Sequence, residues 1–332
     1  MDILTQGLLG GVLAQSIAGK NEKKLATLVG VLAGLLADAD ILISSSTDPL
    51  LNIEYHRHFS HSLLFIPLGA AIAMLLLWPF VHRHVSGKRL YLFCLAGYSM
   101  SGVLDACTSY GTHLFWPFSD ARLALNIISI IDPVFTLVLL VTLLMGLRLG
   151  HRQIAYAGLM LCVVYLGLGF VQLQRAQQVA GTLLEKRGHV ATQSVVKPTL
   201  ANLLLWRSVY IHADHIYVDA IRVGLFDTGK VFEGESVAKF SLHKDLPGLD
   251  VSSPLYADVV RFITFSDGFV AFDPRQANVL GDLRYSMLPL STRPLWGIVI
   301  DRNKPQAHAD YRFFRDNGQS VRQAFLGMLL DR

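Results

Sequence analysis

The stretch His56-Arg57-His58-Phe59-Ser60-His61-Ser62 stands directly before a long apolar run that begins Leu63-Leu64-Phe65-Ile66. Polar groups at the mouth of a membrane helix are costly and usually have a function. Imidazole is the commonest neutral metal ligand, so the stretch predicts a metal site at a helix entrance. His56 and His61 would lie about 140° apart on a regular helix, at ~100° per residue. They converge only if the helix begins between them, with Ser60 as its N-cap.

The composition extends this prediction to the whole chain. Of the 332 residues, 52% are hydrophobic and 16% are charged, below the ~25% charged residues of soluble domains. The long apolar runs fall almost entirely within 1–172, while 173–332 reads like an ordinary soluble sequence. We therefore expect an α-helical membrane bundle of about six spans, followed by a β-rich α+β soluble domain.

The first apolar segment is short for a span, which needs ~20 residues. The expected spans are 3–19, 25–43, 61–81, 89–107, 127–147 and 153–172.

Basic residues predict the orientation of these spans. The loops after the first, third and fifth spans hold Lys20, Lys23, Lys24, Arg83, Lys88, Arg89, Arg148 and Arg152. The opposite loops hold only Arg57 and Arg122, which is a positive-inside pattern. The distribution predicts a multi-pass protein of the bacterial inner membrane with an extracytoplasmic C-terminal domain. It favours the lipid bilayer as partner and gives no indication of nucleic-acid binding.

The polar half should begin with an amphipathic linker helix over 173–198, ending near Gly188. The domain over 199–332 should contain helices at 253–264 and about 319–330. Runs of β-branched and aromatic residues predict strands at Leu203–Ile211, His215–Phe226, Lys230–Phe240, Phe269–Phe272, Val279–Met287 and Leu295–Ile300. An Asp227-Thr228-Gly229 turn should join the second and third.

In the expected topology, six ligand-type side chains from four spans lie at one depth near the outer face. Two of them, Asp38 and Asp40, can share a site only if their helix breaks near Ala39. Such a set suits two divalent ions (Zn²⁺, Mn²⁺ or Mg²⁺), or one ion plus a general base. The candidate metal ligands are Asp38, Asp40, His56, His61, Asp105 and Asp132.

Each residue also has an ordinary structural interpretation. A single intramembrane aspartate can be a satisfied contact or part of an ion pathway. Arg57 can face an anionic substrate group or simply lie at the interface, and His58 can support the site or be exposed. Asp132 before Pro133 fits the start of a helix. The His212/His215 pair is more typical of a structural strand position.

The first ~135 residues resemble the YdjM-like membrane-bound metal-dependent hydrolases, a family that includes proteins described as LexA-binding inner-membrane hydrolases. The motifs are Thr5-Gln6-Gly7, Ala37-Asp38-Ala39-Asp40, the stretch 56–62, Asp105-Ala106-Cys107-Thr108-Ser109-Tyr110-Gly111, Trp116-Pro117-Phe118 and Asp132-Pro133. Three positions depart from the family pattern. Gln6 replaces a histidine, His58 a glycine and Ser60 a threonine, so either Gln6 or His58 could take the place of a family ligand.

Two hypotheses follow. In the first, the protein is a membrane metallohydrolase that acts on a lipid or lipid-linked phosphoester, with Asp40, Arg57 and His58 as catalytic residues. In the second, it is a non-enzymatic membrane transporter or an envelope scaffold protein.

Overall fold

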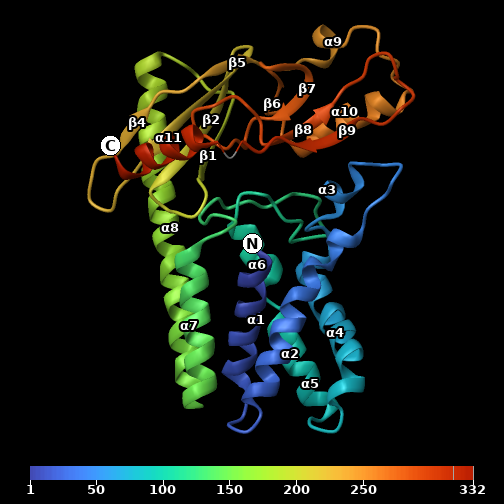
Figure 1. Cartoon of the computed structure of the whole chain (residues 1–332), viewed down its shortest axis with the longest axis vertical. Helices are drawn as coiled ribbons and strands as arrows, with labels where there is room; N and C mark the ends of the chain where they lie inside the picture. The colour runs from blue at the N-terminus through green and yellow to red at the C-terminus, as the bar shows by residue number, and fades with distance from the viewer. Residues whose placement is uncertain (317, 332) are drawn as a thin grey trace. The chain divides into compact units, whose positions relative to one another are not determined.

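The computed structural model describes residues 1–316 and 318–331. The chain divides into two compact units, both drawn in Figure 1. Unit 1 comprises Met1–Ile43, Tyr55–Val171 and Leu200–Asn202. Unit 2 comprises Ser44–Glu54, Gln172–Thr199 and the described residues from Leu203 onward.

Unit 1 is a helical bundle. Its α-helices are α1 (Ile3–Ile17), α2 (Lys23–Leu36), α4 (Ile66–Val81), α5 (Gly87–Tyr98), α6 (Ser101–Cys107), α7 (Pro133–Leu149) and the first part of α8 (Arg152–Arg187). Three short 3-10 helices lie between them: η1 (Ala37–Leu42), η2 (Phe59–His61) and η3 (Leu63–Phe65). The short helix α3 (Leu51–Tyr55) ends where the chain re-enters unit 1.

Among the described residues, four helical stretches are long and apolar enough to cross a membrane. They are Lys23–Leu42, Leu63–Val81, Gly87–Cys107 and Arg152–Arg187. The helices α1 and α7 are apolar but shorter. The expectation of about six spans includes these two and remains a prediction.

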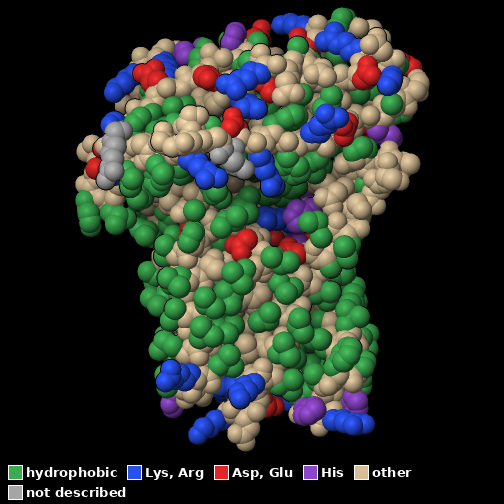
Figure 2. Space-filling view, in the orientation of Figure 1, with side chains coloured by type: hydrophobic (Ala, Val, Ile, Leu, Met, Phe, Trp, Pro, Cys, Tyr) green, Lys and Arg blue, Asp and Glu red, His purple; other side chains and the backbone are tan. Residues whose placement is uncertain are grey.

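Small residues line the contact between α1 and α2, and large apolar residues cover the outside of the bundle. Helix α1 packs on α2, α5 and α7. A Cβ atom at Gly30 would lie 2.4 Å from the Gly10 carbonyl oxygen, so glycine permits the close approach of α1 and α2. Leu75 and Phe80 are largely exposed, and Figure 2 shows hydrophobic side chains covering the helices of unit 1. Such a surface suits lipid rather than water.

Helix boundaries in unit 1 differ in detail from the predictions. The α-helix of the second span ends at Leu36 and continues as η1, which is the break that Asp38 and Asp40 required. The expected N-cap, Ser60, is wrong: Ser62 caps η3 by accepting from the Phe65 N–H, and α4 follows.

Two further spans are shorter or broken. The fourth is interrupted at Ser99–Met100, between α5 and α6. The fifth begins at Pro133 rather than 127, because Asp132 caps it and proline occupies its first turn.

The sixth span and the expected linker helix form one continuous helix, α8. The boundary between the two units falls within it, between Val171 and Gln172. The helix ends at Arg187, before the left-handed Gly188, and the last part of the expected linker is a strand.

Unit 2 contains two antiparallel sheets. The first has the order β1-β2-β3-β4, with β5 also pairing with β3, and the second has the order β6-β7-β8-β9. Val209, Val218, Phe269 and Leu283 pack between the sheets in one buried cluster. The strands are β1 (Gln193–Pro198), β2 (Leu205–His212), β3 (His215–Arg222), β4 (Lys230–Phe232), β5 (Ser236–Ala238), β6 (Val270–Asp273), β7 (Gln276–Asp282), β8 (Trp296–Val299) and β9 (Asp310–Phe313). The helices are the short α9 (Leu242–Asp245), α10 (Pro254–Phe265) and α11 (Gln319–Leu330).

The β-rich prediction is therefore confirmed, with local errors. The run Lys230–Phe240 splits into β4 and β5, and β1 and β9 were not predicted. The expected hairpin turn at 227–229 is part of a longer loop, because β3 already ends at Arg222. His212 and His215 face each other across the β2–β3 register, as a structural pair would.

Candidate metal centre

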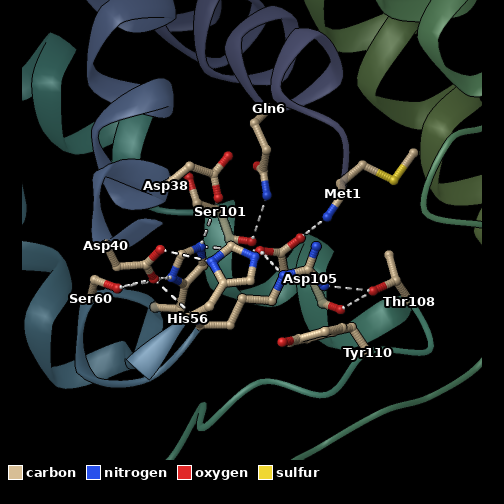
Figure 3. A network of polar contacts seen from close by, with 12 residues as sticks. Met1, Gln6, Asp38, Asp40, His56, Ser60, Ser101, Asp105, Thr108 and Tyr110 are labelled. Atoms are coloured by element: carbon tan, nitrogen blue, oxygen red, sulfur yellow. Dashed lines mark hydrogen bonds and ion pairs between the residues drawn. The ribbon is translucent and has the colours of Figure 1, made fainter. Parts of the chain in front are cut away.

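The candidate site lies where several ends of unit 1 meet: the start of α1, the 3-10 helix η1, the loop before η2, and α6 (Figure 3). In Figure 2, Lys and Arg side chains gather at the opposite end of the helices. A Cβ atom at Gly102 would lie 1.9 Å from the His61 carbonyl oxygen. Glycine at this position therefore brings α6, and with it Asp105, against η2.

His61 is at the centre of the site. Its Nε2 atom lies 3.3 Å from Asp38 Oδ1 and 3.1 Å from Asp105 Oδ2. One ligand atom from each of these residues lies within 4.8 Å of the others. The side chains of His61 and Asp105 are fully buried, and that of Asp38 is 15% exposed. The Asp38–His61–Asp105 group is thus a buried cluster of electron-pair donors whose open side is at the partly exposed Asp38.

Asp40 orients the imidazoles rather than joining this group. Its Oδ1 lies 2.8 Å from His56 Nδ1, and its Oδ2 lies 3.1 Å from His61 Nδ1. The backbone N–H of Arg57 and the hydroxyl of Ser60 also donate to Oδ2. A carboxylate at Nδ1 favours a proton on that nitrogen and leaves the Nε2 lone pair free for a metal.

The geometry around His61 Nε2 therefore calls for a positive charge. A neutral His61 with its proton on Nδ1 would point a lone pair at two carboxylate oxygens, which is repulsive unless a proton or a cation lies between them. Burial lowers the pKa of His61, but hydrogen bonds to Asp105, Asp38 and Asp40 outweigh burial and raise the pKa to about 10. The carboxylates thus attract positive charge to this position.

Arg57 turns inward. Its φ of 63° is in the left-handed region, which is uncommon for a residue with a side chain and often marks a functional site. The guanidinium Nε lies 3.3 Å from Asp105 Oδ2, Nη1 donates to the Thr108 hydroxyl, and the group lies over the Tyr110 ring. The side chain is therefore engaged with Asp105 rather than directed outward.

Two further groups reach the site from the N-terminal segment. The Met1 amino group forms an ion pair with Asp105 Oδ1. Gln6 donates from Nε2 to the Ser101 carbonyl at 3.2 Å. Among the described residues, the buried Gln6 Oε1 accepts no hydrogen bond, whereas Asp105 Oδ2 has the ion-pair contacts to His61 and Arg57 given above. A buried oxygen acceptor without a hydrogen bond, such as Gln6 Oε1, fits a divalent cation, since such an atom is costly to bury unpaired.

Two predicted residues lie outside this group. The Asp132 carboxylate accepts from the N–H groups of Val134 and Phe135 and from the Tyr165 hydroxyl. His58 packs against the rings of His113 and Trp116, with its ring centroid 4.5 Å from that of His113. Burial lowers the pKa of both His58 and His113, the latter to about 4.

His56 lies near the Asp38–His61–Asp105 group but does not join it. Asp40 holds its Nδ1, and its ring centroid lies 6.4 Å from that of His61, but its ligand atoms do not converge with the Asp38–His61–Asp105 group. The side chain is 22% exposed and borders the open side of the site.

Unit 2 contains a second cluster of ligand-type side chains, Asp48, Asp258 and His308. Arg261 donates to Asp48, Glu54 and Asp258, while His308 Nδ1 and the Ala309 N–H contact the other Asp258 oxygen. These contacts already satisfy the carboxylates, so this cluster does not require a cation.

The sequence did not predict that Ser60, Thr108 and Tyr98 support the site: Ser60 was expected only as an N-cap, and the Tyr98 hydroxyl donates to the Ser60 carbonyl. Ser60 and Thr108 lie within the recognised motifs, which was the available signal. Tyr98 is one of two tyrosines in α5, and only its three-dimensional neighbours reveal its role.

Comparison with known proteins agrees with the fold and the motifs. The model of the YdjM inner membrane protein family matches residues 1–176. The chain belongs to the YdjM inner membrane protein family. The resemblance drawn from the motifs is thereby confirmed, and this YdjM-family chain is a membrane protein with apolar helices.

One relative of this YdjM-family chain carries no described activity. The Uncharacterized protein YfhP of Bacillus subtilis (strain 168) is 24% identical over 245 residues, which cover 73% of this chain and 70% of that protein. No solved structure matches the chain.

Proposed function

We propose that the protein is a metal-dependent hydrolase of the bacterial inner membrane. The observation that carries the proposal is the position of His61, whose Nδ1 is anchored by Asp40 while its Nε2 faces Asp38 and Asp105. These three residues would hold a divalent cation, with the Gln6 Oε1 oxygen available as a further donor. When bound, the cation would supply Lewis acidity toward water and a phosphoester.

The chain's own residues would prepare the site for that chemistry. Asp40 would fix the imidazole tautomers, and Arg57 would hold Asp105 in place through its contact with Oδ2. His56, beside the open side, is the group best placed to exchange a proton with a substrate or water. Asp132, as an N-cap bonded to Tyr165, would fix the start of α7.

The position of the site at one end of the apolar helices supports a lipid or lipid-linked phosphoester as substrate. The site lies at one end of apolar helices, with its partly open side formed by Asp38 and His56. The basic loops at the other end would face the cytoplasm, so the site and unit 2 would be extracytoplasmic in a multi-pass topology. A substrate carried in the bilayer could reach such a site without leaving the interface.

The test is hydrolysis of lipid phosphoesters by the purified protein. We expect phosphate or headgroup release from some members of a panel of glycerolipid and polyprenyl phosphoesters when Mn²⁺ or Zn²⁺ is present. Chelation and Asp38→Asn should abolish release, while Asp120→Asn, in an exposed loop, should not. Failure of a metal-loaded protein to consume any lipid or water-soluble phosphoester would contradict the proposal.

A transporter and a scaffold predict different effects of mutations from those expected of a hydrolase. A transporter needs a polar path to the far end of the bundle, where Gln15 donates to the Thr27 hydroxyl and the Leu143 carbonyl. A scaffold predicts that Asp38→Asn is silent in cells while removal of unit 2 is not. A changed lipid extract in cells with Asp38→Asn would favour the hydrolase.

A further inference from the structure

The loop between β3 and β4 presents two large apolar side chains to the outside of unit 2. Leu225 is 54% exposed and Phe226 is 98% exposed. Isolated apolar residues at a surface are ordinary, but two adjacent ones on a firmly held loop are a typical lipid or protein contact.

The loop is held firmly. Asp227 Oδ1 accepts from the backbone N–H groups of Gly224 and Gly229, and Arg222 donates to Asp227 Oδ2. A Cβ atom at Gly229 would lie 2.8 Å from Val179 on α8, so the loop also packs on that helix. These contacts fix the loop in a conformation that leaves Leu225 and Phe226 exposed.

One turn of α8 fixes the position of this loop, which is the gold segment beside that helix in Figure 1. Arg175 donates to the carbonyls of Gly224, Leu225 and Asp227. Gln172 is almost fully buried and donates to the Val223 carbonyl at 2.9 Å. The anchoring residues thus follow directly after the apolar part of α8.

The apolar surface of α8 continues up to this anchor. Phe170 and Val171 are about half exposed and belong to the candidate membrane span, and Gln172 is the next residue. Because α8 is unbroken, the residues that hold the loop, Gln172 and Arg175, follow Val171 in the same helix. Arg175, Arg222 and Lys230 are already paired, with loop carbonyls, Asp227 and Asp331 respectively, so the contact that the loop offers is that of its two apolar side chains.

We propose that Leu225 and Phe226 insert into the interface of the bilayer that the chain itself spans. The occupant of this surface is the boundary between lipid headgroups and acyl chains, where Phe and Leu bind favourably. The contact would fix unit 2 to the membrane at a second point besides α8. It requires only the membrane location and does not depend on any hydrolase activity.

The test uses nitroxide labels on the full chain in vesicles of phosphatidylethanolamine and phosphatidylglycerol. Phe226→Cys is compared with Val190→Cys, which is 78% exposed and follows the far end of α8. Arg187 is twelve residues beyond Arg175, or about 18 Å along a helix at ~1.5 Å per residue. The native cysteines are all buried. Labels at both sites are probed with oxygen, which concentrates in lipid, and with a water-soluble nickel chelate.

We expect the label at 226 to be relaxed more by oxygen than by the nickel chelate, and the label at 190 to show the reverse. Transfer to detergent-free vesicles should also reduce the nickel accessibility at 226 several-fold relative to 190. Equal, water-like accessibility at both positions would overturn the proposal. A label at 226 that neither reagent reaches would indicate a protein contact and would overturn it as well.

Discussion

Asp40 shows how one carboxylate can direct two imidazoles. Each of its oxygens faces the Nδ1 atom of a different histidine, so the Nε2 atoms of His56 and His61 are both left available. An amide cannot do the same, because only its oxygen accepts a hydrogen bond. The residue therefore supports the metal ligands without needing to be one.

Asp40→Asn should lower metal affinity while keeping metal stoichiometry. Loss of a residue that orients a ligand typically costs 10–100-fold in affinity, roughly, and we expect an effect of that size. Calorimetric titration of the purified protein with Mn²⁺ and Zn²⁺ measures it, with Asp120→Asn as control. An unchanged affinity would show that the imidazoles keep their orientation without Asp40.

A buried amine in unit 2 gives a second prediction at this scale. The Lys197 Nζ is buried without a hydrogen-bond partner among the described residues and lies over the Tyr285 ring. Burial lowers the pKa of Lys197 well below its usual value, and Arg284 and Arg207 lower it further, against Asp282. Between the folded and unfolded pKa values the unfolded chain binds more protons, so stability should rise with pH in that window.

Lys197→Met keeps the apolar stem and removes the amine. We expect a gain of about 1–3 kcal/mol in the stability of unit 2 at neutral pH, from the usual cost of an unpaired buried polar group. The rise in stability between neutral pH and the unfolded pKa of ~10.4 should also be lost. Hydrogen exchange of β1 and β2 measures both effects, with the exposed Lys244→Met as control. A wild-type stability that falls over that pH range would contradict this account.

At the scale of elements, the site depends on how closely α6 approaches η2. A Cβ atom at Gly102 cannot fit beside the His61 carbonyl, so Gly102→Ala must push Asp105 away from His61. We expect metal affinity to fall at least tenfold and stability by about 1–3 kcal/mol, as for other overpacked sites. Gly167→Ala, where a Cβ would contact nothing within 4 Å, is the matched control. Equal metal affinities in the two variants would refute the packing argument.

Some features of the fold and the site could be predicted from the sequence, and others could not. Apolar runs and the polar positions next to them predicted the helices and the meeting of Asp38, His61 and Asp105, because hydrophobicity and motif spacing are properties of the sequence itself. They could not show that Asp40 faces the Nδ1 atoms, or that Arg57 turns toward Asp105, since these depend on local turns. The split of 230–240 into β4 and β5 is likewise set by tertiary pairing.

At the scale of the whole molecule, the chain passes through unit 2 on its way from Asp40 to His56. Segment Ser44–Glu54 belongs to unit 2 and connects Asp40 to His56. Within unit 2, Arg261 pairs with both Asp48 and Glu54 of this segment at 2.6–3.0 Å. The position of His56, two residues after Glu54, should thus depend on Arg261.

Arg261→Gln should therefore loosen the segment and weaken the site together. We expect faster hydrogen exchange over 44–54 and a several-fold lower metal affinity, because the ordered connection between Asp40 and His56, which lie beside the ligands, is lost. Arg312→Gln removes an exposed arginine that pairs with Asp310 and should change neither. Faster exchange over 44–54 with unchanged metal affinity would show that unit 2 does not influence the site.

The most direct measurement of the central claim is the metal bound to the purified protein and to His61→Ala. After equilibration with Mn²⁺ or Zn²⁺ and removal of free ion, elemental analysis should find at least one divalent ion per wild-type chain. The same analysis of His61→Ala, at equal folding by circular dichroism, should find little or none. A wild-type chain without metal, or a variant that retains the full amount, would contradict the account.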